Sequence, residues 1–240
     1  MPCNSGVSLI PMVNGNLEYF GARGLFNGLA LLGDYTTNSY WDHITGTCLH
    51  GELKGSQLAF TDFDLLYTTT AGALQMHPNV EIALSPRLNL HGRFMKLVSP
   101  VAHFILGNRL PPHFQRTVGE ADTRREVMDL GLGIWTNEAH CYYPLEAIKA
   151  ASSGILDTFD GQTVFIYYNT LAKAPDALYI NANTVQLQDE RFVFDTGVYL
   201  VNGRLCSEEG QELQVNRPQQ MFTRWYGFSY TFPECKIYEG

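Results

Sequence analysis

The sequence has no long apolar segment and lacks the motifs of the common nucleotide-binding and hydrolase folds. No run approaches the roughly 18 to 20 apolar residues that cross a bilayer, so we expect no membrane span. The N-terminus, MPCNSGVSLIPMV, lacks the basic start and apolar stretch of a signal peptide. As written, the chain is predicted to be cytoplasmic, and exported if its N-terminus is truncated. The absence of Gly-x-x-x-x-Gly-Lys, Gly-x-Ser-x-Gly and His-Glu-x-x-His motifs disfavours the corresponding chemistries.

Cysteine is present without the spacing of a disulfide or zinc scaffold. The five cysteines are odd in number and far apart, so we expect mostly buried free thiols and no cofactor; they are Cys3, Cys48, Cys141, Cys206 and Cys235. Charged residues make up 17% of the chain and hydrophobic residues 45%, which excludes a disordered protein. The formal charge of -8 disfavours nucleic acid and anionic lipid as partners.

One long segment, between Glu81 and Glu120, has no acidic residue at all. It contains five basic residues and three histidines: Arg87, Arg93, Lys96, Arg109, Arg116, His91, His103 and His113. Because the whole chain carries -8 and this segment +5, the remainder carries -13. We interpret the segment as a solvated basic connector docked on two acidic lobes, the alternative being a site for an anion or a protein partner.

The patterns that are present indicate β structure. Asn-Gly pairs in SLIPMVNGNLEYF and VYLVNGRLC predict two tight hairpins, because both residue types accept the positive φ of a type I′ turn. Short apolar segments between residues 163 and 205 predict an antiparallel meander. Helical signals are few. Thr61 followed by Asp64 suits a helix over residues 62–76, and Pro144 suits a short helix over residues 144–151. The predicted fold is mainly β (α+β), with antiparallel sheets.

A weak internal repeat divides the chain. Residues 66–82 align without gaps with residues 221–237 and share four identities, which pair Thr68 with Thr223, Gly72 with Gly227, Pro78 with Pro233 and Ile82 with Ile237. A Gly-punctuated β segment containing a Cys precedes both copies. We therefore expect two related β-rich repeats, the first at residues 1–85 and the second at residues 132–240, joined by the basic connector at residues 86–131.

The stretch DYTTNSYWDHITGTCLHGELKGSQL, residues 34–58, carries a pattern of spaced residues. They are Asp34, Thr37, Ser39, Trp41, Thr45, Gly46, Gly51, Leu53, Gly55 and Leu58. YFGARGLFNG, at residues 19–28, precedes it, and the second half adds Gly133, Ala139, Tyr143, Pro144, Leu145, Asp157 and Gly161. In these positions the chain resembles the uncharacterised family catalogued as domain of unknown function 3179.

This resemblance implies a β-rich fold and supplies no established activity. The chain departs from the family pattern in two places. Where members usually carry a Cys-x-x-Cys-like motif, it has Cys3-Asn4-Ser5-Gly6, which puts a shared dithiol or metal role in doubt. Members also usually have an earlier copy of the Ala-Tyr-Pro segment, so we expect this chain to lack the N-terminal part of the first repeat.

Residues 34–43 combine side chains that could hold a small ligand. In a strand, one face would carry an indole beside hydroxyls and an imidazole, which suits a small ligand or a sugar. The alternative is a polar turn whose side chains bond the backbone, followed by a core Trp. We favour the turn. The candidate ligand-binding residues are Asp34, Thr37, Ser39, Trp41 and His43.

Thiols and imidazoles supply a second candidate site. Cys48 and His50 lie two apart in a predicted strand, where both could bind one metal ion. A zinc site needs three or four ligands, so this pair alone does not define one. His140 and Cys141 are adjacent and would point to opposite faces of a strand, so we set them aside.

No arrangement in the sequence defines a reaction. The expected function is a non-catalytic binding or structural module for a small ligand, a glycan or a protein partner. The alternative is an enzyme with a Cys/His site, metal-assisted or not, in which Cys48, His50 or His43 acts as a ligand or as an acid or base. Only the enzyme requires a reactive thiol or a bound metal.

Overall fold

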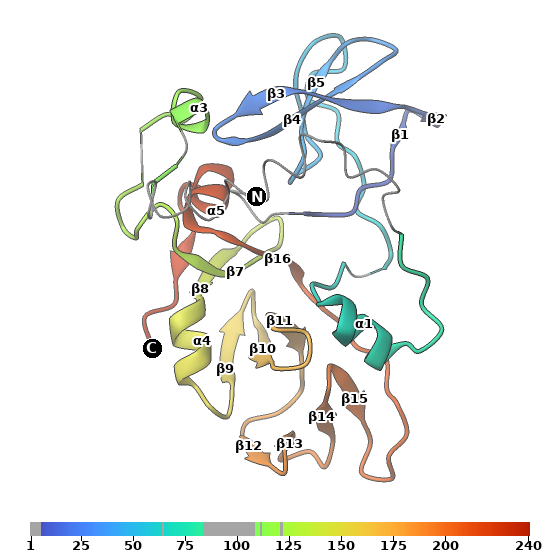
Figure 1. The fold of residues 1–240 in the computed structure, drawn as a ribbon, viewed down its shortest axis with the longest axis vertical. Helices are drawn as coiled ribbons and strands as arrows, with labels where there is room; N and C mark the ends of the chain where they lie inside the picture. Colours follow the sequence, from blue (N-terminus) through green and yellow to red (C-terminus); the bar gives the residue numbers. More distant parts are fainter. Residues whose placement is uncertain (1–5, 64, 84–108, 111, 121) are drawn as a thin grey trace, which may run out of the picture.

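The protein is described from a computed structural model that places residues 6–63, 65–83, 109–110, 112–120 and 122–240 (Figure 1). Within these residues the strands form five sheets, and every strand pairing but one is antiparallel. No helix in this part of the chain is long and apolar enough to span a membrane. The predicted class, mainly β with antiparallel sheets and short helices, is confirmed.

The first half forms a two-stranded ribbon and a four-stranded sheet with the order β3-β4-β5-β6. Its strands are β1 (Met12–Val13), β2 (Asn16–Leu17), β3 (Phe20–Phe26), β4 (Leu29–Asp34), β5 (Tyr40–Asp42) and β6 (Cys48–His50). The predicted hairpin at Asn14 and Gly15 is confirmed, with φ values of 50° and 81°. A further Asn-Gly turn, at Asn27 and Gly28, joins β3 to β4 in the same way.

The second half contains three sheets, with the orders β16-β7-β8-β17, β11-β10-β9 and β12-β13-β14-β15. Their strands are β7 (Leu130–Trp135), β8 (His140–Pro144), β9 (Ile155–Phe159), β10 (Gln162–Asn169), β11 (Ala174–Tyr179), β12 (Val185–Gln188), β13 (Arg191–Phe194), β14 (Tyr199–Val201), β15 (Arg204–Cys206), β16 (Gln219–Arg224) and β17 (Lys236–Ile237). The predicted meander is confirmed but is divided between two of these sheets. The hairpin predicted at Asn202 and Gly203 joins β14 to β15.

The described helices are short: α1 (Thr70–Met76), α3 (Pro112–Gln115), α4 (Leu145–Ala150) and α5 (Trp225–Thr231). The prediction for residues 144–151 is confirmed as α4. The prediction for residues 62–76 is wrong in its first part, because the helix begins only at Thr70. The Thr69 hydroxyl accepts a hydrogen bond from the Gly72 amide at 3.0 Å, so Thr69 caps the helix in place of Thr61.

Helices α1 and α5 occupy matching positions in the aligned segments. The alignment that pairs residue 66 with residue 221 also pairs the two helices residue for residue. A Cβ atom on Gly72 would lie 2.6 Å from the Thr68 hydroxyl oxygen. At the equivalent place, a Cβ atom on Gly227 would lie 2.9 Å from the Thr223 hydroxyl oxygen. This correspondence supports the internal repeat, which stays a proposal.

The two halves share a hydrophobic core. Figure 1 shows the β3–β6 sheet at the top, strands β9 to β15 at the bottom, and α5 with β7, β8 and β16 between them. Leu29 of the first half packs in one buried cluster with Trp225 and Phe228 of α5. Tyr67 of the first half also contacts Phe222 of the second half, with the two rings edge-on and their centroids 6.1 Å apart. Each half therefore covers apolar surface of the other.

Candidate functional site

The carboxylate of Asp34, at the end of β4, is enclosed by its own turn. It accepts hydrogen bonds from the Thr37 amide at 2.6 Å and the Thr37 hydroxyl at 3.0 Å. The Ser39 amide and the Trp41 indole donate to it at 3.0 Å and 2.9 Å. Burial alone would raise the pKa of Asp34, but hydrogen bonds from Trp41, Thr37 and Ser39 outweigh it and lower the pKa. The turn therefore holds this carboxylate in its ionised form.

The hydroxyls of the same turn are also engaged. Thr37 Oγ1 and Ser39 Oγ lie 2.7 Å apart, and Ser39 Oγ accepts a hydrogen bond from the Leu53 amide at 3.2 Å. The Trp41 side chain is fully buried and meets the Phe20 ring edge-on at 5.6 Å. The favoured interpretation of this stretch, a polar turn followed by a core Trp, is confirmed.

Four residues are predicted from the sequence to share one face of a strand: Thr37, Ser39, Trp41 and His43. They do not lie in one strand. Strand β5 is three residues long, so Thr37 and Ser39 precede it and His43 lies in the turn that follows. Burial lowers the pKa of His43, although the Asp42 carboxylate favours the charged imidazole. The ligand-binding role stays a prediction for this set, whose carboxylate and hydroxyls are bonded within the turn and to the Leu53 amide.

Cys48 and His50, the predicted metal pair, lie in different environments. Cys48 is buried in a cluster with Trp41 and Leu58. The His50 side chain is exposed and stacks on Tyr40, with ring centroids 6.2 Å apart. The register shifts between β5 and β6 at this point, which breaks the strand alternation assumed for the pair. No group of three or more His, Cys, Asp and Glu side chains suited to a metal occurs among the described residues.

The described thiols are buried, and three of them are shifted away from the thiolate form. Burial raises the pKa of Cys141 and of Cys235 to about 11, and it also raises the pKa of Cys48. Cys206 is buried in β15. Because the thiolate is the nucleophile, Cys48, Cys141 and Cys235 are poorly prepared for attack at neutral pH. Cys3 lies outside the described residues.

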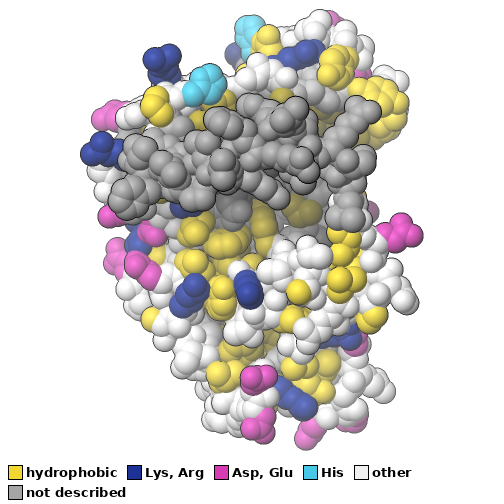
Figure 2. Space-filling model, in the orientation of Figure 1, with side chains coloured by type: hydrophobic (Ala, Val, Ile, Leu, Met, Phe, Trp, Pro, Cys, Tyr) yellow, Lys and Arg dark blue, Asp and Glu magenta, His cyan; other side chains and the backbone are white. Residues whose placement is uncertain are grey.

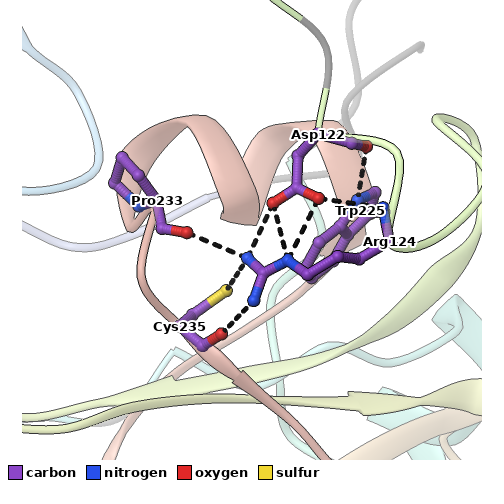
Figure 3. A network of polar contacts seen from close by, with 5 residues as sticks. All are labelled: Asp122, Arg124, Trp225, Pro233 and Cys235. Carbon is purple, nitrogen blue, oxygen red and sulfur yellow. Dashed lines mark hydrogen bonds and ion pairs between the residues drawn. The ribbon is translucent and has the colours of Figure 1, made fainter.

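Arg124, near the end of the predicted connector, is bound to the segment around α5 (Figure 3). Its guanidinium lies 2.6 Å from the Asp122 carboxylate and donates to the carbonyl oxygens of Cys235 at 2.8 Å and Pro233 at 2.9 Å. It also lies 5.2 Å from the centre of the Trp225 ring. Hydrogen bonds from Arg124 lower the pKa of Asp122. The guanidinium thus joins the connector to the second half.

Three other described basic side chains of the connector are exposed, namely Arg109, His113 and Arg116. The segment between them contributes to the shared core through Leu110 and Phe114. Arg125 is half-buried and forms ion pairs with Asp129 and Glu146. A partner-docking role for the connector stays a prediction, and Arg87, Arg93, Lys96, His91 and His103 lie outside the described residues.

A pocket of about 250 Å³ opens between α4, the end of β10 and the β12–β15 sheet. Its lining includes Ile148 and Lys149 of α4, Tyr168 of β10, Phe192 of β13 and Leu200 of β14. In the lower part of Figure 2, hydrophobic side chains are exposed between charged ones over this half of the molecule. Sequence reasoning missed this pocket because four separate segments line it. The one available signal was the aromatic content of residues 163–205.

A tighter pocket of about 30 Å³ lies where Leu65 of the first half meets the second half. Its polar wall is a buried ion pair, with Arg217 Nε 3.3 Å from Asp176 Oδ1. Tyr167 Oη and Gln220 Nε2 each donate to the same carboxylate at 2.9 Å. This volume suits about one or two water molecules. Because the carboxylate is bonded on several sides, the arrangement is structural.

The fold and these sites define a mainly β protein with interlocked halves, buried thiols and an open pocket of mixed polarity. Residues 2–235 match the family described as "Protein of unknown function (DUF3179)", so the chain belongs to that family. The resemblance drawn from residues 19–58 and the second half is therefore confirmed. No curated protein and no solved structure matches the chain.

Proposed function

We propose that the protein is a non-catalytic binding module whose ligand occupies the pocket between α4, β10 and the β12–β15 sheet. One observation carries this proposal. Ser152, Thr170 and Asn202 line the pocket beside apolar side chains. Their side chains make no hydrogen bond within the described part of the chain. Small-ligand sites are usually lined by apolar side chains together with a few polar groups that are available to the ligand.

The candidate reactive groups support binding rather than catalysis. The Asp34 carboxylate is bonded within its turn, burial raises the pKa of Cys48, and His50 stacks on an exposed tyrosine. An enzyme of the Cys/His type needs a thiolate close to a base, and these residues lie in separate environments. The pocket itself is lined by neither Cys nor His among the described residues.

A pocket-filling variant tests the proposal. Ala151 lines the pocket at the end of α4, whereas the neighbouring Ala150 is exposed and does not line it. We expect a screen of small polar and aromatic compounds by saturation-transfer NMR to give compounds that bind the wild-type chain. Ala151→Phe should abolish their binding, and the matched Ala150→Phe should keep it.

Two results would overturn this function. Compounds that bind Ala151→Phe as well as the wild type would place the ligand elsewhere. Conversion of a bound compound into a product by the wild-type chain, but not by Ala151→Phe, would make the protein an enzyme. Circular dichroism of both variants checks that the fold is kept.

A further inference from the structure

Two of the aromatic rings that line the pocket, those of Phe192 and Tyr168, are partly exposed. The Phe192 ring is held edge-on against Phe165 and Tyr167, with ring centroids 5.1 Å and 5.4 Å away. Tyr168 also lines the pocket, and the Lys149 ammonium group lies over one face of its ring, 4.8 Å from the ring centre. Because both rings are partly exposed, a ligand can reach them. Rigid aromatic surfaces of this kind suit a ligand with a flat hydrocarbon face.

Short neutral polar groups surround these rings. The hydroxyls of Ser152 and Thr170 and the amide of Asn202 belong to three different segments of the lining. Hydroxyls and amides both donate and accept hydrogen bonds. They therefore match a ligand whose own groups do both, and a hydroxyl group is the simplest example.

The charges at the pocket balance. Lys149 is the cation of the lining and Glu190 its carboxylate. The whole chain carries -8, so its long-range field opposes an anionic ligand. A cationic ligand would meet the Lys149 ammonium group beside the Tyr168 ring. A neutral ligand avoids both penalties.

We infer that the pocket takes a neutral saccharide of one or two rings. A saccharide ring has a hydrocarbon face that stacks on an aromatic ring, and hydroxyls at its edge that pair with Ser, Thr and Asn. The volume of about 250 Å³ is slightly below the roughly 300 Å³ at which ordinary ligand pockets begin, which limits the enclosed part to about one ring. This inference rests on the proposed function and adds the chemical class of the ligand.

Calorimetric titration with named sugars tests the inference. The probes are glucose, N-acetylglucosamine and their β-1,4-linked dimers, with glucuronic acid and glucosamine as charged counterparts. We expect at least one neutral probe to bind, and its charged counterpart to bind at least about tenfold more weakly. Phe192→Ala should weaken binding by about tenfold or more, because it removes the stacking surface. Phe26→Ala, which replaces an exposed Phe of the first half, should leave binding unchanged.

Each other outcome has a defined meaning. If Phe192→Ala does not fold, Thr170→Val tests the polar rim, with an expected loss of about fivefold. Tighter binding of a charged sugar than of its neutral form would overturn the inference. So would binding to the pocket by non-saccharide compounds alone, although the binding function would then stand. If neither the sugars nor the screened compounds bind the wild type and Ala151→Phe differently, both the saccharide inference and the proposed binding function are overturned.

Discussion

The Asp34 carboxylate joins a turn to the core, since its donors include the backbone of Thr37 and the indole of Trp41. Asp34→Ala would leave these donors without an acceptor in a buried place. We expect the free energy of unfolding to fall by about 3 kcal/mol, because each unsatisfied buried group costs about 1–3 kcal/mol. Urea unfolding measures this change. Asp62→Ala, at an exposed position, should stay within about 0.5 kcal/mol of wild type, and a loss below about 1 kcal/mol for Asp34→Ala would contradict the account.

The buried thiols give a second prediction for single residues. Burial raises the pKa of Cys141 and Cys235 to about 11 and also raises the pKa of Cys48. At pH 7.5, which is roughly one unit below the ordinary cysteine pKa, these three residues therefore carry little thiolate. Iodoacetamide labelling followed by peptide mass spectrometry should modify these three much more slowly in the native protein than in urea. Rapid native labelling of Cys48 would instead favour the Cys/His enzyme.

Part of the candidate site can be predicted from residue types. Asp, Thr and Ser before Trp41 indicate a polar turn, because such side chains bond nearby amides, and the structure has this turn. The environments of Cys48 and His50 cannot be predicted in this way, because a local register shift decides them. The pocket at Lys149 and Phe192 depends on tertiary packing of distant segments, which residue patterns do not encode.

At the scale of elements, turn chemistry was more informative than helix signals. The Asn-Gly pairs at residues 14–15 and 202–203 give the expected hairpins because few residue types accept their positive φ values. The sequence predicts a start at Thr61 for the helix that ends at Met76. Thr69 caps it, and Leu65 instead lines the pocket against the second half. Tertiary contact therefore decides this boundary, which local sequence does not specify.

The cap of α1 provides a prediction at this scale. Thr69→Ala removes the side-chain acceptor for the Gly72 amide, so we expect a loss of about 1 kcal/mol in unfolding free energy. Thr70→Ala is the matched control, because Thr70 is exposed and alanine favours a helix interior. Guanidinium unfolding of both variants measures the difference. Equal stability of Thr69→Ala and Thr70→Ala would show that the cap contributes nothing.

At the scale of the whole molecule, the shared core makes the two proposed repeats dependent on each other. Leu29 of the first half is buried against Trp225 and Phe228 of the second. We expect Leu29→Ala to destabilise the whole chain by about 3 kcal/mol, with fluorescence and circular dichroism transitions that still coincide. Leu17→Ala, at an exposed leucine of the same half, is the control. Loss of the first half alone, seen as two separate transitions, would contradict a shared core.

The division into two repeats and a connector stays a proposal. Four identities suggested the repeat, and matching helices support it. The contribution of Leu110 and Arg124 to contacts between segments was not apparent, because a run of basic residues gives no information on what it packs against.

Chemical-shift mapping on the uniformly ¹⁵N-labelled chain tests whether a small ligand occupies the pocket between α4, β10 and the β12–β15 sheet. The titrants are the strongest binders among the screened compounds and the neutral sugars named above. We expect amide shifts concentrated in the segments that line the pocket, at residues 148–152, 167–170, 187–192 and 200–203. Shifts concentrated instead around residues 34–50, or no saturable shifts with any titrant, would contradict binding at this pocket.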